Sequence, residues 1–288
     1  MTEIKDATRS ETRVRAAGAT AGEAEEKVAQ VRARYGAIAV SSSSCCGPTC
    51  CGAPEISRQI GYGETELRAV PAEADLGLGC GAPIGHLKLQ AGETVLDLGS
   101  GPGLDALLAA TAVGPTGRVI GVDMTPEMLE RARATAAKAG ATQVEFREGR
   151  LEALPVADAS VDAVTSNCVI NLVPDKAVVF REVARVLRPG GRIVVSDIVL
   201  ERPLPEVVAR DVLAWVGCVA GAVDRREYFR MIEAAGLGEV TVLKDDDYVA
   251  ALVKTAPEEA DRLLARWGIA REDLLGTVRS VTWRAVRS

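Results

Sequence analysis

Apolar residues along this chain form short runs that alternate with longer stretches of mixed polarity. Five short segments have the character of strands, at residues 94–98, 118–122, 144–147, 161–166 and 192–198, and most of them are rich in valine, isoleucine and leucine. Helical patterns separate them, at residues 104–113, 126–140 and 175–187. Such regular alternation of strand and helix predicts a parallel sheet with helices on both faces.

Both ends of the chain extend this pattern. Near the N-terminus, Val28, Val31 and Tyr35 recur at helical spacing, which predicts an amphipathic covering helix over residues 23–35 that Gly36 closes. After the fifth strand, helices are expected at residues 205–216, 225–235 and 257–269. Residues 239–243 are expected to form a strand, and residues 279–286 alternate apolar and polar side chains, as a last antiparallel strand would.

The expected fold class is therefore α/β, with a Rossmann-like, mostly parallel seven-stranded sheet and an antiparallel last strand. Residues 1–19 are polar and aperiodic, which predicts a disordered leader. Residues 20–85 are expected to hold the covering helix and a cysteine-rich loop. Residues 86–288 are expected to form one ligand-binding domain with a helical insertion around residues 203–235.

Length and charge narrow the function classes. A chain of 288 residues suffices for one large α/β domain with extensions. The net charge of −6 argues against a nucleic-acid-binding surface and favours a small substrate. No apolar run approaches the roughly 18 residues that span a bilayer, and the charged N-terminus is unlike a signal peptide. A cytoplasmic protein without a membrane partner is therefore expected.

The first predicted strand runs directly into a glycine-rich turn. Three glycines stand there at alternate positions: Gly99, Gly101 and Gly103. They leave the backbone open to a ligand, which the amides at the start of the next helix would face. The nicotinamide fingerprint requires glycine or alanine where this chain has Leu104. Asp97 before the glycines and Asp123 after the second strand instead resemble the S-adenosylmethionine site of class I methyltransferases.

Seven cysteines and a single histidine, His86, limit the available chemistry. An odd number of cysteines without an export signal indicates reduced thiols, and one histidine excludes a multi-histidine metal site. Four thiols lie in a loop rich in serine and glycine: Cys45, Cys46, Cys50 and Cys51. Because the usual C-x₂-C spacing with a second pair is absent, a flexible arm that delivers soft ligands is favoured over a structural zinc site.

The other three cysteines lie in segments that resemble a known family. Three segments are similar to signature segments of arsenite S-adenosylmethionine methyltransferases, at residues 77–83, 166–176 and 217–222. The likeness extends from about Val28 to the last strand. The resemblance implies that three thiols hold trivalent arsenic: Cys80, Cys168 and Cys218. It also implies that an N-terminal thiol passes arsenic inward, with Cys45 and Cys46 as possible delivery thiols.

The resemblance further implies a cofactor site and partners. S-adenosylmethionine would be held by Asp97, Gly99, Ser100, Gly101, Gly103, Asp123, Met124, Leu151 and Asn167. Within this set, Asp123 would bind the ribose, Met124 would lie against the adenine, and Asn167 would lie near the methyl group. Many methyltransferases have an acid at the position of Arg150, and its contact with the adenine amine is left here to the backbone or to Glu152. The implied partners are arsenite or its thiol conjugates and a reductant of the glutathione or thioredoxin type.

The chemistry of arsenic suits these residues. Trivalent arsenic is soft and prefers thiolate ligands. Its lone pair can attack a sulfonium methyl group in line, so that methyl transfer needs positioning rather than a general base. The expected function is thus arsenite methylation in arsenic detoxification. Two rivals are a methyltransferase for an organic metabolite, which would survive loss of all three thiols, and a metalloid-binding module that does not bind S-adenosylmethionine.

Overall fold

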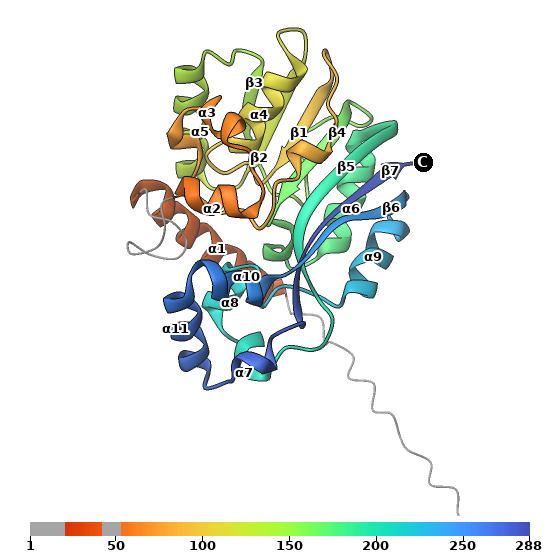
Figure 1. Cartoon of the computed structure of the whole chain (residues 1–288). Helices are drawn as coiled ribbons and strands as arrows, with labels where there is room; N and C mark the ends of the chain where they lie inside the picture. The colour runs from red at the N-terminus through yellow and green to blue at the C-terminus, as the bar shows by residue number, and fades with distance from the viewer. Residues whose placement is uncertain (1–20, 42–52) are drawn as a thin grey trace, which may run out of the picture.

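The sheet is the framework of the molecule. A computed structural model describes residues 21–41 and 53–288; the predicted leader and the four N-terminal cysteines lie outside them. The strands are β1 (Thr94–Leu98), β2 (Arg118–Asp123), β3 (Val144–Glu148), β4 (Val161–Asn167), β5 (Leu187–Leu200), β6 (Leu237–Asp247) and β7 (Val278–Arg287). They lie in the order β3-β2-β1-β4-β5-β7-β6, with β7 antiparallel to both of its neighbours. This confirms the predicted fold class (Figure 1).

Helices cover both faces of the sheet. On one face lie α4 (Leu104–Val113) and α5 (Pro126–Ala139), and on the other lie α6 (Lys176–Val186) and α9 (Arg225–Ala234). Alternate residues of β1 explain the arrangement, since Val95 belongs to the cluster of α4 and α5 whereas Leu96 belongs to that of α6 and α9. The apolar strands are thereby buried on both sides, as expected for parallel strands.

A group of further helices lies at one end of the sheet (Figure 1). It consists of α1 (Ala21–Ser41), α7 (Glu206–Ala209), α8 (Val212–Val216), α10 (Tyr248–Thr255) and α11 (Pro257–Trp267). Side chains of this group share an apolar cluster with Cys80, Cys168 and Cys218. Within the two described ranges, no helix is long and apolar enough to cross a membrane.

The structure corrects two predicted helix boundaries. Gly36 does not close α1, which continues to Ser41. A Cβ at Gly36 would lie 3.1 Å from the Glu127 carboxylate, so this glycine permits close packing of α1 on α5. The single helix predicted at residues 205–216 is instead divided into α7 and α8, because the Asp211 side chain caps α8 by accepting from Leu213 N at 2.6 Å.

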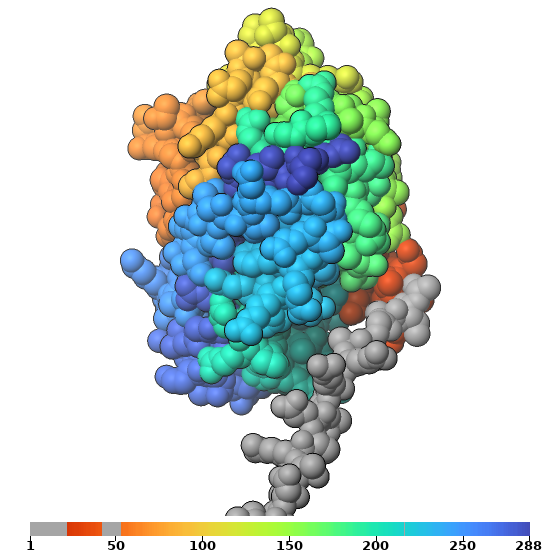
Figure 2. Space-filling model, turned by 90° about the vertical axis from the view of Figure 1, so that its right-hand side faces the viewer, coloured from red at the N-terminus to blue at the C-terminus, as the bar shows by residue number. Residues whose placement is uncertain are grey.

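Other elements differ in length or were missed. The pattern of apolar residues does not indicate the short helices α2 (Ala53–Ile60), α3 (Glu64–Arg68) and α10 as separate elements. Strands β5 and β6 are longer than their apolar patterns, since both pair with β7 along most of their length. Figure 2 views the β6 side of the molecule, where light-blue residues of α9 and β6 lie at the surface. Charged side chains on this edge, such as Lys244 and Asp246, protect it from pairing with another chain.

Candidate active site

The glycine turn after β1 is held in shape by the end of β2. Gly99 and Gly101 both have left-handed backbone, with φ of 63° and 50°. The amide of Gly101 donates to Asp123 Oδ2 at 2.9 Å, and Asp123 Oδ1 accepts from Thr125 N at 2.8 Å. A Cβ at Gly99 would lie 2.4 Å from Val169 Cγ2, so a larger residue there would displace the segment that follows Cys168.

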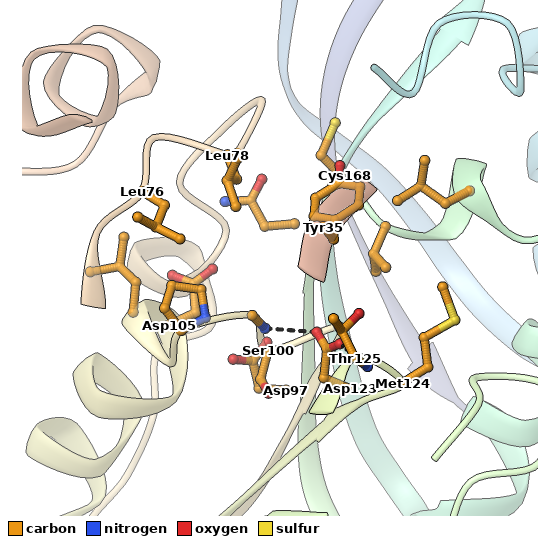
Figure 3. A pocket seen from close by; sticks show the side chains of 18 of the residues that line it. Tyr35, Leu76, Leu78, Asp97, Ser100, Asp105, Asp123, Met124, Thr125 and Cys168 are labelled. Carbon is orange, nitrogen blue, oxygen red and sulfur yellow. Dashed lines mark hydrogen bonds between the residues drawn. The ribbon is translucent and has the colours of Figure 1, made fainter. Parts of the chain in front are cut away.

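A cavity opens beside this turn. Its empty space, counted to the open mouth, is about 1100 Å³, enough for a nucleoside-sized ligand. Eight of the predicted cofactor-binding residues line it: Asp97, Gly99, Ser100, Gly101, Asp123, Met124, Leu151 and Asn167. Gly103 does not line it, because its position faces the Phe146 ring, and a Cβ there would lie 2.9 Å from Phe146 Cζ. Figure 3 shows Asp123 and Met124 at one end of the cavity and Leu76 and Asp105 at the other.

Three buried polar atoms of residues that line this cavity have no hydrogen-bond partner among the described residues. They are Asp75 Oδ2, Asp97 Oδ2 and Ser100 Oγ. Burial, followed by the charges of Asp105 and Asp123, raises the pKa of Asp97 well above its ordinary value. A buried carboxylate that lacks a partner is unfavourable unless a ligand supplies a positive or hydrogen-bonding group. The cavity therefore fits a cationic cofactor with an exposed amino group, which S-adenosylmethionine has.

Sequence patterns missed a second polar group at this end of the cavity. The Tyr62 hydroxyl donates to Asp105 Oδ1 at 2.7 Å and accepts from Asn167 Nδ2 at 2.9 Å. Burial raises the pKa of Asp105 to about 6. The position of Asp105, just after the glycine turn, was a signal in the sequence that could have indicated a ligand contact. Tyr62 lies in no motif that indicates a ligand. Both residues belong to the wall that faces the ligand.

The raised pKa of Asp105 predicts pH-dependent cofactor binding. The folded protein holds the proton of the Asp105 carboxyl more tightly than the unfolded chain does. The stabilising contribution of Asp105 to the free energy of unfolding is therefore present below pH 3.8 and is lost as the pH rises through about 6. Deprotonation adds a negative charge near the ligand, and we expect affinity for S-adenosylhomocysteine to rise about 10-fold between pH 5 and pH 7. Titration calorimetry at several pH values measures this. Asp105→Asn should flatten the profile, and an unchanged profile would rule out this group.

The three described thiols meet beside the cavity. Cys80, Cys168 and Cys218 are all buried, and hydrogen bonding by Cys218 and Cys80, followed by burial, raises the pKa of the Cys168 thiol well above its ordinary value. The Cys218 thiol also donates to the Cys168 carbonyl oxygen at 2.7 Å. Only Cys168 of the three lines the cavity. Figure 3 shows it across the cavity from Asp97 and Asp123.

The thiols do not yet form a finished metal site. Across residues 21–41 and 53–288, no three histidine, cysteine, aspartate or glutamate side chains are arranged to hold a metal ion. Cys168 nevertheless interacts with both other thiols, and all three lie in one buried cluster. Cys168 and Cys218 also have left-handed backbone, with φ of 58° and 65°. Such strain in non-glycine residues persists only where the surrounding structure holds it, and it is common at functional sites.

Asn167 fixes the position of the Cys80 segment. Its Oδ1 accepts from Cys80 N at 3.1 Å, and its Nδ2 donates to Gly81 O at 2.7 Å. On the other side, the Ser280 hydroxyl donates to Cys80 O at 2.7 Å. A Cβ at Gly79 would lie 2.5 Å from Asn167 Nδ2, which explains why a glycine precedes Cys80. The Asn167 side chain thus contacts the Cys80 segment and Tyr62, and it also lines the cavity. Its predicted place near the methyl group stays a prediction.

Replacement of Asn167 by alanine is expected to loosen this segment. The change leaves a buried amide and a carbonyl without partners, so we expect the free energy of unfolding to fall by roughly 2–3 kcal/mol. Ser280→Ala, which removes one hydrogen bond to Cys80, should cost only about 1 kcal/mol. Urea denaturation compares the two variants. Equal stability of Asn167→Ala and the unaltered protein would contradict the anchoring role.

An ion pair joins Glu25 of α1 to Arg150, which lines the cavity. Arg150 Nη1 lies 2.7 Å from Glu25 Oε1, and Arg150 Nη2 lies 2.8 Å from Glu152 Oε1. Val28, Val31 and Tyr35 of α1 line the cavity itself. α1 therefore covers the ligand space. Glu152, which with the backbone was one of two predicted contacts of the adenine amine, is paired with Arg150 and also lines the cavity.

Comparison with known proteins gives several arsenite methyltransferases, together with methyltransferases of another kind. A methyltransferase domain family model matches residues 89–236. An arsenite methyltransferase of Halobacterium salinarum is 47% identical over 235 residues, which cover 77% of this chain and 60% of the relative. An arsenite methyltransferase of Aquipseudomonas alcaligenes is 35% identical, covering 73% of this chain and 62% of the relative. The chain thus spans about 60% of the length of these two relatives.

A solved structure extends the comparison to the fold. The arsenic (III) S-adenosylmethionine methyltransferase of Chlamydomonas reinhardtii is 33% identical, with a TM-score of 0.58. The match covers 81% of this chain and 74% of that one. Together with the domain match, it shows that this chain belongs to the arsenic(III) S-adenosylmethionine methyltransferase family.

Proposed function

We propose that this protein transfers a methyl group from S-adenosylmethionine to arsenite, which serves arsenic detoxification. The observation that carries the proposal is a cluster of three buried thiols, one of which, Cys168, lines the cavity that fits the cofactor. An organic acceptor needs no such thiols, whereas trivalent arsenic prefers sulfur ligands. The cavity also argues against a binding module without a cofactor, because Asp97 and Asp123 remain available to one.

The proposed cofactor contacts follow the length of the cavity. Asp123 binds the ribose, and Met124 and Leu151 lie against the adenine. Asp97, Gly99, Ser100 and Gly101 surround the methionine part. S-adenosylmethionine supplies an electrophilic methyl group, which the lone pair of thiol-bound arsenic attacks. Asn167 contributes indirectly in this proposal, by holding Cys80 beside Cys168.

The thiols bind the substrate by exchange. Each sulfur of Cys80, Cys168 and Cys218 that bonds to arsenic displaces one hydroxide, and the thiol proton leaves with it as water. Methyl transfer then uses the arsenic lone pair and leaves arsenic formally pentavalent. A thiol reductant of the glutathione or thioredoxin type is proposed to return the two electrons. Cys45 and Cys46 are proposed to deliver arsenite, and the reaction is proposed to occur in the cytoplasm.

The proposed domain organisation follows from these roles. Residues 20–85 form a cap whose helix α1 covers the cavity and whose cysteine-rich loop supplies delivery thiols. Residues 86–288 form the methyltransferase domain. Its helical insertion around residues 203–235 contributes Cys218 to the substrate site.

A direct assay tests the function. The protein is mixed with arsenite, methyl-labelled S-adenosylmethionine and glutathione, and arsenic species are separated by chromatography. Methylated arsenic is the expected product. Label found only on an organic acceptor would favour the metabolite methyltransferase, and binding of arsenite without any labelled product would favour the binding module.

A further inference from the structure

We propose that Asp75, from the segment between α3 and Cys80, binds the ammonium group of the methionine part of the cofactor. The inference rests on the proposed function and adds a residue to its cofactor site. Asp75 lies neither in the glycine turn nor at the end of a strand. It comes from the cap segment, 22 residues before Asp97 in the chain.

The two carboxylate oxygens of Asp75 have different surroundings. Oδ1 accepts from the Ser57 hydroxyl at 2.6 Å and from Gly77 N at 3.0 Å. Oδ2 is buried and has no hydrogen-bond partner in the described part of the chain. The residue is 7% exposed and lines the cavity. Since one oxygen already serves the local fold, the other is available to a ligand.

The charge of the surroundings selects a cation. Beyond the larger effect of burial, repulsion by Asp75 raises the pKa of nearby Asp105, and repulsion by Asp105 raises the pKa of Asp97. Among described residues that line the cavity, Arg150 is the only arginine or lysine, and it is paired with Glu25 and Glu152. Three buried carboxylates without a counter-ion are unfavourable, so a positive ligand group at this end is strongly favoured. An ammonium group with three N–H donors can satisfy Asp75 and a second acid together.

The position of Asp75 agrees with the expected direction of the cofactor. Its neighbour Leu76 and Asp105 lie at the end of the cavity away from Asp123 and Met124 (Figure 3). A cofactor whose ribose contacts Asp123 extends its amino-acid part past Asp97 toward this end. A ribose contact for Asp75 would place the ribose at the wrong end. The amino group is the one cationic group of the product S-adenosylhomocysteine.

The test compares two ligands on one variant. Asp75→Asn keeps an oxygen that accepts from Ser57 and Gly77, so the fold is retained, but it removes the charge. We expect affinity for S-adenosylhomocysteine to fall about 10- to 100-fold by titration calorimetry, the range for a hydrogen bond to a charged group. Affinity for the deaminated analogue of S-adenosylhomocysteine, which lacks only the ammonium, should change less than about 3-fold. Glu73→Gln, at an exposed acid two residues before Asp75 that does not line the cavity, is the matched control and should bind both ligands nearly as the unaltered protein does.

The outcomes are distinct. Equal weakening of both ligands by Asp75→Asn would assign Asp75 to the local fold, and no weakening of either would exclude it from the site; each result overturns the inference. If Asp75→Asn does not fold, Asp75→Glu, in which the carboxylate is displaced, takes its place in the test. The unaltered protein should then prefer S-adenosylhomocysteine over the deaminated analogue, and Asp75→Glu should lose this preference. Failure of the unaltered protein to bind S-adenosylhomocysteine at all would contradict the proposed function itself and the inference with it.

Discussion

Replacement of Cys168 by serine is expected to abolish methyl transfer to arsenite while cofactor binding stays nearly unchanged. Cys168 alone of the three described thiols both lines the cavity and contacts the other two. A serine hydroxyl is a hard, weakly acidic ligand that does not replace thiolate on arsenic. We expect a loss of at least about 10³-fold in turnover, equivalent to roughly 4 kcal/mol of transition-state stabilisation. Transfer of labelled methyl to arsenic measures turnover, and calorimetry with S-adenosylhomocysteine measures binding.

A control for this variant is available at Ser280 on β7, whose hydroxyl donates to Cys80 O. Ser280→Ala weakens the support of Cys80 without removing a thiol, and it should keep most of the activity. Cys80→Ser and Cys218→Ser should each lower turnover strongly, since both thiols contact Cys168. Full activity of Cys168→Ser would remove the thiols from the mechanism. Activity on an organic acceptor in the same variant would favour the rival methyltransferase.

Replacement of Asp123 by alanine is expected to give the second largest effect, a loss of cofactor binding. The Asp123 carboxylate accepts from Gly101 N and Thr125 N, and it lines the cavity where the ribose is proposed to bind. Its removal frees the glycine turn and deletes a charged acceptor. We expect affinity for S-adenosylhomocysteine to fall about 100- to 1000-fold, from two lost hydrogen bonds to a charged group.

The matched control for Asp123→Ala is Glu148→Ala. Glu148 is the register partner of Asp123 on β3, ends its strand at the same sheet edge, and does not line the cavity. Its replacement should leave affinity within about 2-fold, as expected for an exposed residue outside the site. Similar losses in both variants would mean that the sheet edge, rather than the ribose contact, is responsible. Unchanged binding by Asp123→Ala would refute its role in the site.

The part of the site that could be predicted from the sequence depends on local backbone. Strand β1, the glycine turn and Asp123 follow one another in a pattern that parallel α/β topology brings to a single edge. The meeting of Cys80, Cys168 and Cys218 has no such local signal, because irregular segments and a helical insertion carry two of the three. Resemblance to a family was needed to predict it. Cys168 interacts with both other thiols, and the three-thiol arsenic site stays a proposal.

What the sequence could not indicate lies mostly in tertiary contacts. Gly36 was predicted to end the first helix, but a glycine is present there because the Glu127 side chain packs closely against that position. Tyr62 and Asp75 come from the cap, and only the folded structure brings them to the cavity wall. The contacts by which the Asn167 amide holds the Cys80 segment were not predicted, while its place near the methyl group stays a prediction. Such roles depend on neighbours far apart in the chain, which periodicity and propensity do not encode.

The central claim is that sulfur atoms of Cys80, Cys168 and Cys218 together hold arsenic. X-ray absorption spectroscopy at the arsenic edge tests it most directly, on protein with one equivalent of arsenite and with Cys45, Cys46, Cys50 and Cys51 replaced by serine. The account predicts an arsenic atom bound by three sulfur neighbours, which falls to two when Cys168→Ser is added. A shell of oxygen neighbours, or a sulfur shell that Cys168→Ser leaves unaltered, would contradict it.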